Sequence, residues 1–173
     1  MTDCLGKVKS SPPTSPATAL RAFEEVVRRT PESLLRWRDD FFQHLVESYE
    51  SEGYDHVEVV SSRGGEGEVV ARVHRVARLA PETPLTVRGR VVYTGALEWE
   101  AWEEYFFGPS AVATSCKRWS LNPEAHGTRV REEVMWWNHN LRVSRRVLAK
   151  ADLITLSQAE HAFRKVMDAL RRP

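Results

Sequence analysis

Two segments, residues 69–79 and 85–94, alternate apolar and polar side chains with a period of two. Successive side chains of a β-strand point to opposite faces, so each segment predicts a strand with one buried apolar face. Pro81 and Pro84 lie between the segments and predict the turn that joins them. We therefore expect an antiparallel β-meander whose other face is basic. The residues predicted on that basic face are Arg72, His74, Arg78, Arg88 and Arg90.

Further strand patterns flank this pair. A strand begins near His56, and residues 111–121 predict another. Residues 96–107 fit either a helix or a strand, because their apolar positions satisfy both periodicities. We favour a strand for residues 129–137, and the sequence leaves helix or hairpin open for the whole of residues 129–150.

Helical patterns lie at both ends of the chain. Apolar residues at helical spacing predict a helix over residues 17–29. Thr30, followed by proline, is a typical N-cap and predicts a second helix over residues 31–52. Ser157 and Glu160 form a capping box that predicts the start of a last helix. Together the patterns predict an α+β fold, an antiparallel β-meander with helices packed on one face: two N-terminal helices and a C-terminal helix.

The chain reads as one domain preceded by a tail. Residues 1–16 are rich in serine and proline with little to bury, which predicts a flexible tail. Residues 17–173 show no repeat and no change of composition, and we expect a single domain. No apolar run approaches the ~18–20 residues that span a bilayer, and the first residues lack the apolar core of a secretory signal. We therefore expect a cytoplasmic protein with no membrane partner.

Sequence motifs for cofactor, metal or nucleophilic chemistry are absent. The six histidines show none of the close metal-binding spacings, and the glycine-rich residues 64–67 match no phosphate-binding loop. Cys4 and Cys116 cannot form a disulfide framework. Cys116 precedes Lys117 and Arg118, which could lower its thiol pKa, but its position in an alternating strand is typical of a small buried residue. We predict no cofactor and no metal, and we favour a non-enzymatic protein.

Tryptophans and a basic carboxyl third are the remaining signals. Most of the six tryptophans are expected in the core. Trp136 and Trp137 are adjacent, so in a strand one lies in the core and the other on the opposite face. Residues 105–173 carry twelve lysines or arginines and six acidic residues. If the segment after residue 141 is helical, it forms a basic ridge of Arg142, Arg145, Arg146 and Lys150.

These features support three hypotheses about function. The first is a non-enzymatic interaction or assembly protein that docks a protein partner, or a second copy of itself, through the basic face and exposed aromatics. The second is a nucleic-acid-binding accessory protein that uses the same arginines and the basic ridge. The third is a small enzyme or ligand binder with an aromatic-lined pocket. The absence of catalytic signatures favours the first, and the third predicts a pocket lined by Trp99, Trp102 or Trp136.

Overall fold

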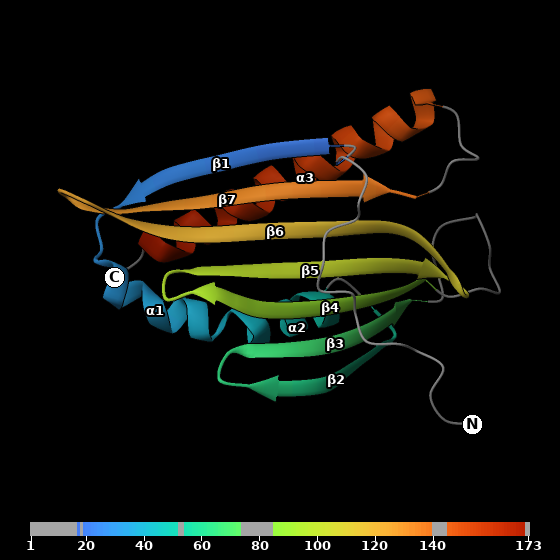
Figure 1. Ribbon diagram of the computed structural model, residues 1–173, viewed down its shortest axis with the longest axis horizontal. Coiled ribbons are helices and arrows are strands. Elements are labelled where there is room, and N and C mark those ends of the chain that lie inside the picture. Colours follow the sequence, from blue (N-terminus) through green and yellow to red (C-terminus); the bar gives the residue numbers. More distant parts are fainter. Residues whose placement is uncertain (1–16, 18, 52–53, 74–84, 140–144, 172–173) are drawn as a thin grey trace.

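Seven antiparallel strands form one sheet in the computed structural model, which describes residue 17 and residues 19–51, 54–73, 85–139 and 145–171. Their order is β1-β7-β6-β5-β4-β3-β2 (Figure 1). The run from β2 to β7 is therefore an antiparallel meander, as predicted, and β1 joins its far edge beside β7. The strands are β1 (Ala19–Val27), β2 (His56–Arg63), β3 (Glu66–Val73), β4 (Leu85–Gly95), β5 (Glu98–Phe107), β6 (Ser110–Glu124) and β7 (Gly127–Asn138).

Three helices of the described residues cover one face of this sheet (Figure 1). They are α1 (Pro31–Asp39), α2 (Phe41–Ser51) and α3 (Arg145–Arg171). The first two helices lie toward β2, β3, β4 and β6, and α3 runs along β1 and β7. We call the helix-covered side of the sheet the inner face and the other side the outer face. The predicted α+β class, with helices packed on one face, is confirmed.

The helix expected over residues 17–29 is wrong, because most of this segment forms strand β1. Phe23 and Val27 are four residues apart, a spacing that suits one side of a helix but, being even, also one face of a strand. Leu20 is on the outer face and is 67% exposed, so it contributes nothing to an apolar stripe. The segment pairs with β7 over all nine of its residues, and this ladder overrides the local helical pattern.

The other two predicted helices exist with different limits. Thr30 caps α1 as predicted, because its hydroxyl accepts a hydrogen bond of 3.3 Å from the Ser33 N–H. The second predicted helix is interrupted at Asp40, which ends α1 before α2 begins. Helix α3 begins at Arg145, so Ser157 lies inside the helix and is not its N-cap. The capping-box pattern therefore predicted a helix start several turns after the observed one.

Both segments that the sequence left open contain strands. Residues 96–107 contain β5, and the favoured strand at residues 129–137 lies within β7. In β5, Trp99 and Ala101 point to the inner face and are buried. The open segment after Asn138 leads into α3. The predicted tail at residues 1–16, His74, Arg78 and Arg142 lie outside the described residues.

Aromatic side chains fill the core between the inner face and the helices. Trp99 and Trp119 lie opposite each other on β5 and β6, and their ring centroids are 6.0 Å apart. Trp37 of α1 meets both rings edge-on, at 5.1 and 5.3 Å. Phe163 of α3 stacks on Trp119 at 5.8 Å. The helices from both ends of the chain therefore converge on the same two strands.

Candidate functional site

The predicted basic face is the outer face of β3 and β4, and it is balanced by carboxylates. Arg90 lies 3.5 Å from Glu68, its cross-strand neighbour. Arg88 is 7% exposed and its guanidinium lies 5.3 Å from the centroid of the Phe106 ring. Arg72 is on the same face, opposite Thr86. The structure thus brings Arg72, Arg88 and Arg90 together on the outer face. Glu68 compensates the charge of Arg90, and the Phe106 ring packs against Arg88.

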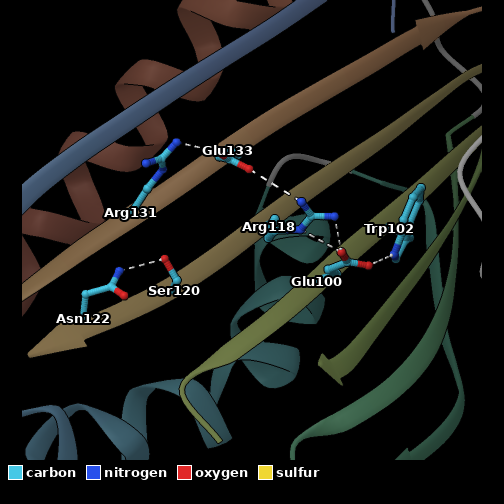
Figure 2. A network of polar contacts seen from close by, with 7 residues as sticks. All are labelled: Glu100, Trp102, Arg118, Ser120, Asn122, Arg131 and Glu133. Atoms are coloured by element: carbon cyan, nitrogen blue, oxygen red, sulfur yellow. Dashed lines mark hydrogen bonds and ion pairs between the residues drawn. The ribbon is translucent and has the colours of Figure 1, made fainter. Parts of the chain in front are cut away.

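Ion pairs continue across the outer face toward β7 (Figure 2). Arg118 of β6 bridges two neighbouring strands, with its guanidinium 2.9 Å from Glu100 on β5 and 3.7 Å from Glu133 on β7. Arg131 lies 2.5 Å from the same Glu133. The Trp102 indole N–H donates to Glu100 at 2.9 Å. The described part of the outer face therefore carries both signs of charge in neighbouring ion pairs, and it is not a uniformly basic surface.

The adjacent tryptophans of β7 face opposite sides, as the strand pattern predicts. Trp136 lies on the inner face, where its ring is 5.3 Å from Tyr105. Trp137 lies on the outer face, is 4% exposed and stacks on Trp102 at 6.1 Å. Trp102 is therefore on the opposite side of the sheet from Trp99 and Trp136, and these three cannot line one pocket. Arg145 and Arg146 are the first two residues of α3, the helix that packs along β1 and β7, whereas Arg72, Arg88 and Arg90 belong to β3 and β4.

Cys116 is a buried residue of the outer-face cluster. Its side chain packs beside Trp102 and Trp137 and is fully buried. Burial, followed by the nearby Glu100 carboxylate, raises the pKa of the thiol far above its usual value, and Arg118 only partly counteracts this. The interpretation of Cys116 as a small buried residue is confirmed, and the hint of a reactive thiol is wrong.

The inner face carries a cluster of polar side chains in the middle of the sheet. Ser115 of β6 lies directly opposite Glu103 of β5 in the strand register. Lys117, two residues along β6, is opposite Val134, whose neighbour on the same face is Glu132. Lys117 is thus the diagonal neighbour of two carboxyls, one on each adjacent strand. We call Tyr49, Glu103, Tyr105, Ser115, Lys117 and Glu132 the inner polar cluster.

Glu103 is the hydrogen-bonded centre of the inner polar cluster. The Tyr49 hydroxyl donates to its Oε1 at 2.5 Å, and Ser115 and Tyr105 donate to its Oε2 at 3.0 and 3.2 Å. The Lys117 ammonium lies 3.4 Å from Oε2. Burial alone would raise the pKa of this carboxyl, but the Lys117 charge and the hydrogen bonds outweigh burial and hold the pKa below its usual value. Glu103 is therefore an ionised carboxylate inside the protein.

Glu132 is the opposite case, a buried carboxyl that lacks such support. It is 2% exposed, and its Oε2 has no hydrogen-bond partner among the described residues. Its cross-strand neighbours are Trp119 and Phe23, and Phe163 of α3 stacks on both rings. Burial raises the pKa of Glu132 to about 7, because the attraction of Lys117 is too weak to compensate and the Glu103 charge adds repulsion. Glu132 titrates near neutral pH in this structure.

Solvent reaches this part of the inner face. Lys117 retains 30% exposure of its side chain, although β6 is a central strand and its side chain points toward the helices. Tyr105 and Trp136, on the two adjoining strands, are half-buried on the same face. The helices therefore leave Lys117 partly accessible, while Glu103 and Glu132 beside it are buried. We call the inner polar cluster together with Trp136 the inner-face site.

Sequence reasoning missed most of this site, although one signal was present. Glu132 is in phase with Val130 and Val134, the buried positions of its strand, so a carboxyl occupies an apolar position. Glu103 is likewise in phase with Trp99 and Ala101. Charged residues on the apolar side of a strand are the pattern that marks a buried ionisable group.

Neither a metal site nor a membrane-spanning helix is found in the part of the chain that the structure describes. No three histidine, cysteine, aspartate or glutamate side chains there are grouped so that they could hold a metal ion. None of the described helices combines the length and apolar character that crossing a membrane requires.

Comparison with known proteins gives the fold and no closer relationship. No family model and no curated protein matches the chain. Among solved structures, the Mll3558 protein from Rhizobium loti is 15% identical, with a TM-score of 0.54 over 88% of this chain and 94% of that one. A START superfamily protein from Mycobacterium smegmatis is 12% identical, with a TM-score of 0.51 over 87% of this chain and 98% of that one. Ara h 8.0201 is 11% identical, with a TM-score of 0.53 over 88% and 98%. The protein therefore shares its fold with these structures, and in this chain that fold is a seven-stranded antiparallel sheet with a long C-terminal helix packed on one face.

Proposed function

We propose that this protein binds a small, mainly apolar molecule at the inner-face site, between the sheet and helix α3. The observation that carries the proposal is the inner polar cluster itself. It places two carboxyls and an ammonium in an aromatic core, where the Lys117 side chain is still 30% exposed. Ligand sites of this kind are mostly apolar, with a few polar groups that fix the ligand's orientation.

Stability alone gives a poor account of these residues. Buried ion pairs recover little more than their desolvation cost, and apolar residues of similar volume are often as stable or more stable. Glu132 lowers the stability of the fold further, because burying a carboxyl oxygen without a described partner costs folding free energy. These groups do little for folding, but they could hydrogen-bond or pair with a bound molecule.

The other two hypotheses have less support. Docking of a protein or a nucleic acid was based on a basic face and exposed aromatics. Arg90 and Arg118 lie beside carboxylates, and Trp137 is buried against Trp102. These observations favour the ligand-binding hypothesis, with Trp99 and Trp136 on the ligand's side of the sheet and Trp102 on the other.

Titration with N-phenyl-1-naphthylamine, a neutral apolar dye that brightens in apolar surroundings, tests the proposal. We expect saturable binding with one dye per chain and energy transfer from the tryptophans. Trp136→Ala should weaken dye binding by about tenfold, because it removes an aromatic wall. Arg118→Ala is the control, since Arg118 follows Lys117 but lies on the outer face. Dye binding that is unsaturable, or equally weakened by both variants, contradicts the proposal.

A further inference from the structure

We propose that the natural ligand carries a protonated amine on an apolar body, and that this amine pairs with the carboxylate of Glu132. This inference rests on the proposed function and specifies the class of ligand. Its geometric basis is the position of Glu132 on the inner face, one diagonal step from Lys117 and next to the solvent-accessible part of the site.

The charges of the inner polar cluster do not balance. Lys117 is in contact with Glu103, and this pair compensates itself. Glu132 is then a second acid for which the described part of the site supplies no second cation. One positive charge from a ligand would neutralise the site when Glu132 is ionised.

Among the residues that the structure describes, none donates a hydrogen bond to Glu132 Oε2. Its two cross-strand neighbours are aromatic, and the indole N–H of Trp119 makes no hydrogen bond to any described acceptor, this carboxyl included. Phe163 covers the same row from α3. A buried acceptor of this kind is expected to be satisfied by a group that arrives from outside, and an ammonium is the strongest such donor.

The titratable groups that the structure describes facing Glu132 from the elements packed around it have other partners. From β1, Arg21 and Glu25 point to the inner face, and each forms an ion pair with α3: Arg21 with Glu160 at 3.7 Å, and Glu25 with Arg171. From β5 and α2, Tyr105 and Tyr49 donate to Glu103, and Lys117 of β6 contacts that same carboxylate.

Aromatic rings beside the carboxyl also suit a cation. Trp119 adjoins Glu132 on the sheet, and Phe163 lies over the row. The face of an aromatic ring attracts an ammonium group, and the attraction strengthens when water is excluded. The same rings provide apolar contact for the body of the ligand.

Three naphthalenes with one apolar body test the inference by displacing the neutral dye. They are 1-naphthylmethylamine, 1-naphthalenemethanol and 1-naphthoate. We expect the amine to bind at least about tenfold more tightly than the alcohol, because only the amine forms a charge-assisted hydrogen bond with Glu132. Glu132→Gln keeps the shape and removes the charge, so it should abolish this preference. Glu133→Gln, the next residue on the outer face, removes the same charge and should leave the preference unchanged.

The pH dependence gives a second readout. An alkylamine stays protonated between pH 6 and 8, while Glu132 is largely protonated at the lower end of that range. The amine must then displace a proton, so its affinity for the native protein should fall as the pH drops below about 7. In Glu132→Gln the affinity for the amine should be flat over the same range. Near-UV circular dichroism of each variant verifies that it is folded.

The possible outcomes separate this inference from the proposed function. Equal affinities for the three naphthalenes in the native protein, with the dye still displaced, overturn the amine and leave the ligand site intact. Tighter binding of 1-naphthoate overturns it as well and identifies Lys117 as the anchor. Failure of both the dye and all three naphthalenes to bind overturns the inference together with the proposed function. Preference for the amine that disappears in Glu132→Gln alone supports both.

Discussion

The ammonium of Lys117 lies 3.4 Å from Glu103 Oε2, on the face of the sheet that the helices cover. Lys117→Met should therefore destabilise the protein, because it leaves the Glu103 carboxylate buried without its cation. We expect a loss of about 1–3 kcal/mol in the free energy of unfolding, less than for a fully buried pair because Lys117 is partly exposed. Urea denaturation measures it. Arg118→Met removes a neighbouring outer-face cation and should cost about 1 kcal/mol or less; equal losses would contradict the burial of the Glu103 pair.

Glu132 should make the native protein less stable as the pH rises toward neutrality. Its pKa is raised to about 7 in the folded state, so the folded protein binds a proton that the unfolded chain has released. The stabilising contribution of the protonated form is complete below the unfolded pKa and is lost as the pH rises through about 7. Between pH 4 and pH 8, the stability of Glu132→Gln relative to the native protein should therefore increase by about 2–3 kcal/mol.

Urea denaturation of the two proteins at several pH values measures this difference directly. Other titrating groups contribute equally to both proteins, so the difference isolates Glu132. A difference that stays constant with pH would show that the carboxyl titrates normally.

The Tyr49 hydroxyl anchors helix α2 to the sheet through Glu103. Tyr49→Phe removes the 2.5 Å hydrogen bond to a buried carboxylate and should cost about 1.5–3 kcal/mol of unfolding free energy. Tyr93→Phe is the matched control, because its hydroxyl donates to the exposed Asp39 at 3.1 Å. Thermal unfolding of both variants should show the larger fall in midpoint for Tyr49→Phe; the reverse order would contradict the account of the cluster.

Cys116 should be inert in the folded protein. Burial raises the pKa of its thiol and keeps reagents out, so the thiolate needed for reaction does not form. In a Cys4→Ala variant, 5,5′-dithiobis(2-nitrobenzoic acid) should modify Cys116 only at the rate of unfolding. Rapid modification under native conditions would contradict the packing of Cys116 with Trp102 and Trp137.

The meander could be predicted because apolar and polar residues alternate along its strands with a period of two. In β4, Val87 and Val91 alternate with arginines, and the strand has its apolar side on the inner face as expected. Strand β1 could not be identified in the same way. Phe23 and Val27 satisfy both periods, and the inner positions between and before them are charged residues that pair with α3. The choice there depends on pairing with β7, which is remote in sequence.

The inner-face site was harder to predict than the fold. A charged residue in phase with apolar ones, such as Glu132 between Val130 and Val134, indicates a buried charged group. The pattern does not indicate which side chains of other strands lie beside it. Lys117 meets Glu103 and Glu132 because of the register of β5, β6 and β7, and local sequence carries little information on register. The arginines could be recognised in the sequence because they alternate with apolar residues along single strands, while acids that balance them, such as Glu68 beside Arg90, lie on other strands.

The position of a bound molecule decides whether the inner face of the sheet is the ligand site. The indole N–H signals of the tryptophans in a ¹⁵N-labelled sample can be assigned by single substitutions and followed during titration with N-phenyl-1-naphthylamine. We expect saturable shifts for Trp119 and Trp136 on the inner face, with the Trp102 and Trp137 signals unchanged. Shifts confined to Trp102 and Trp137 would place the ligand on the outer face and contradict the account.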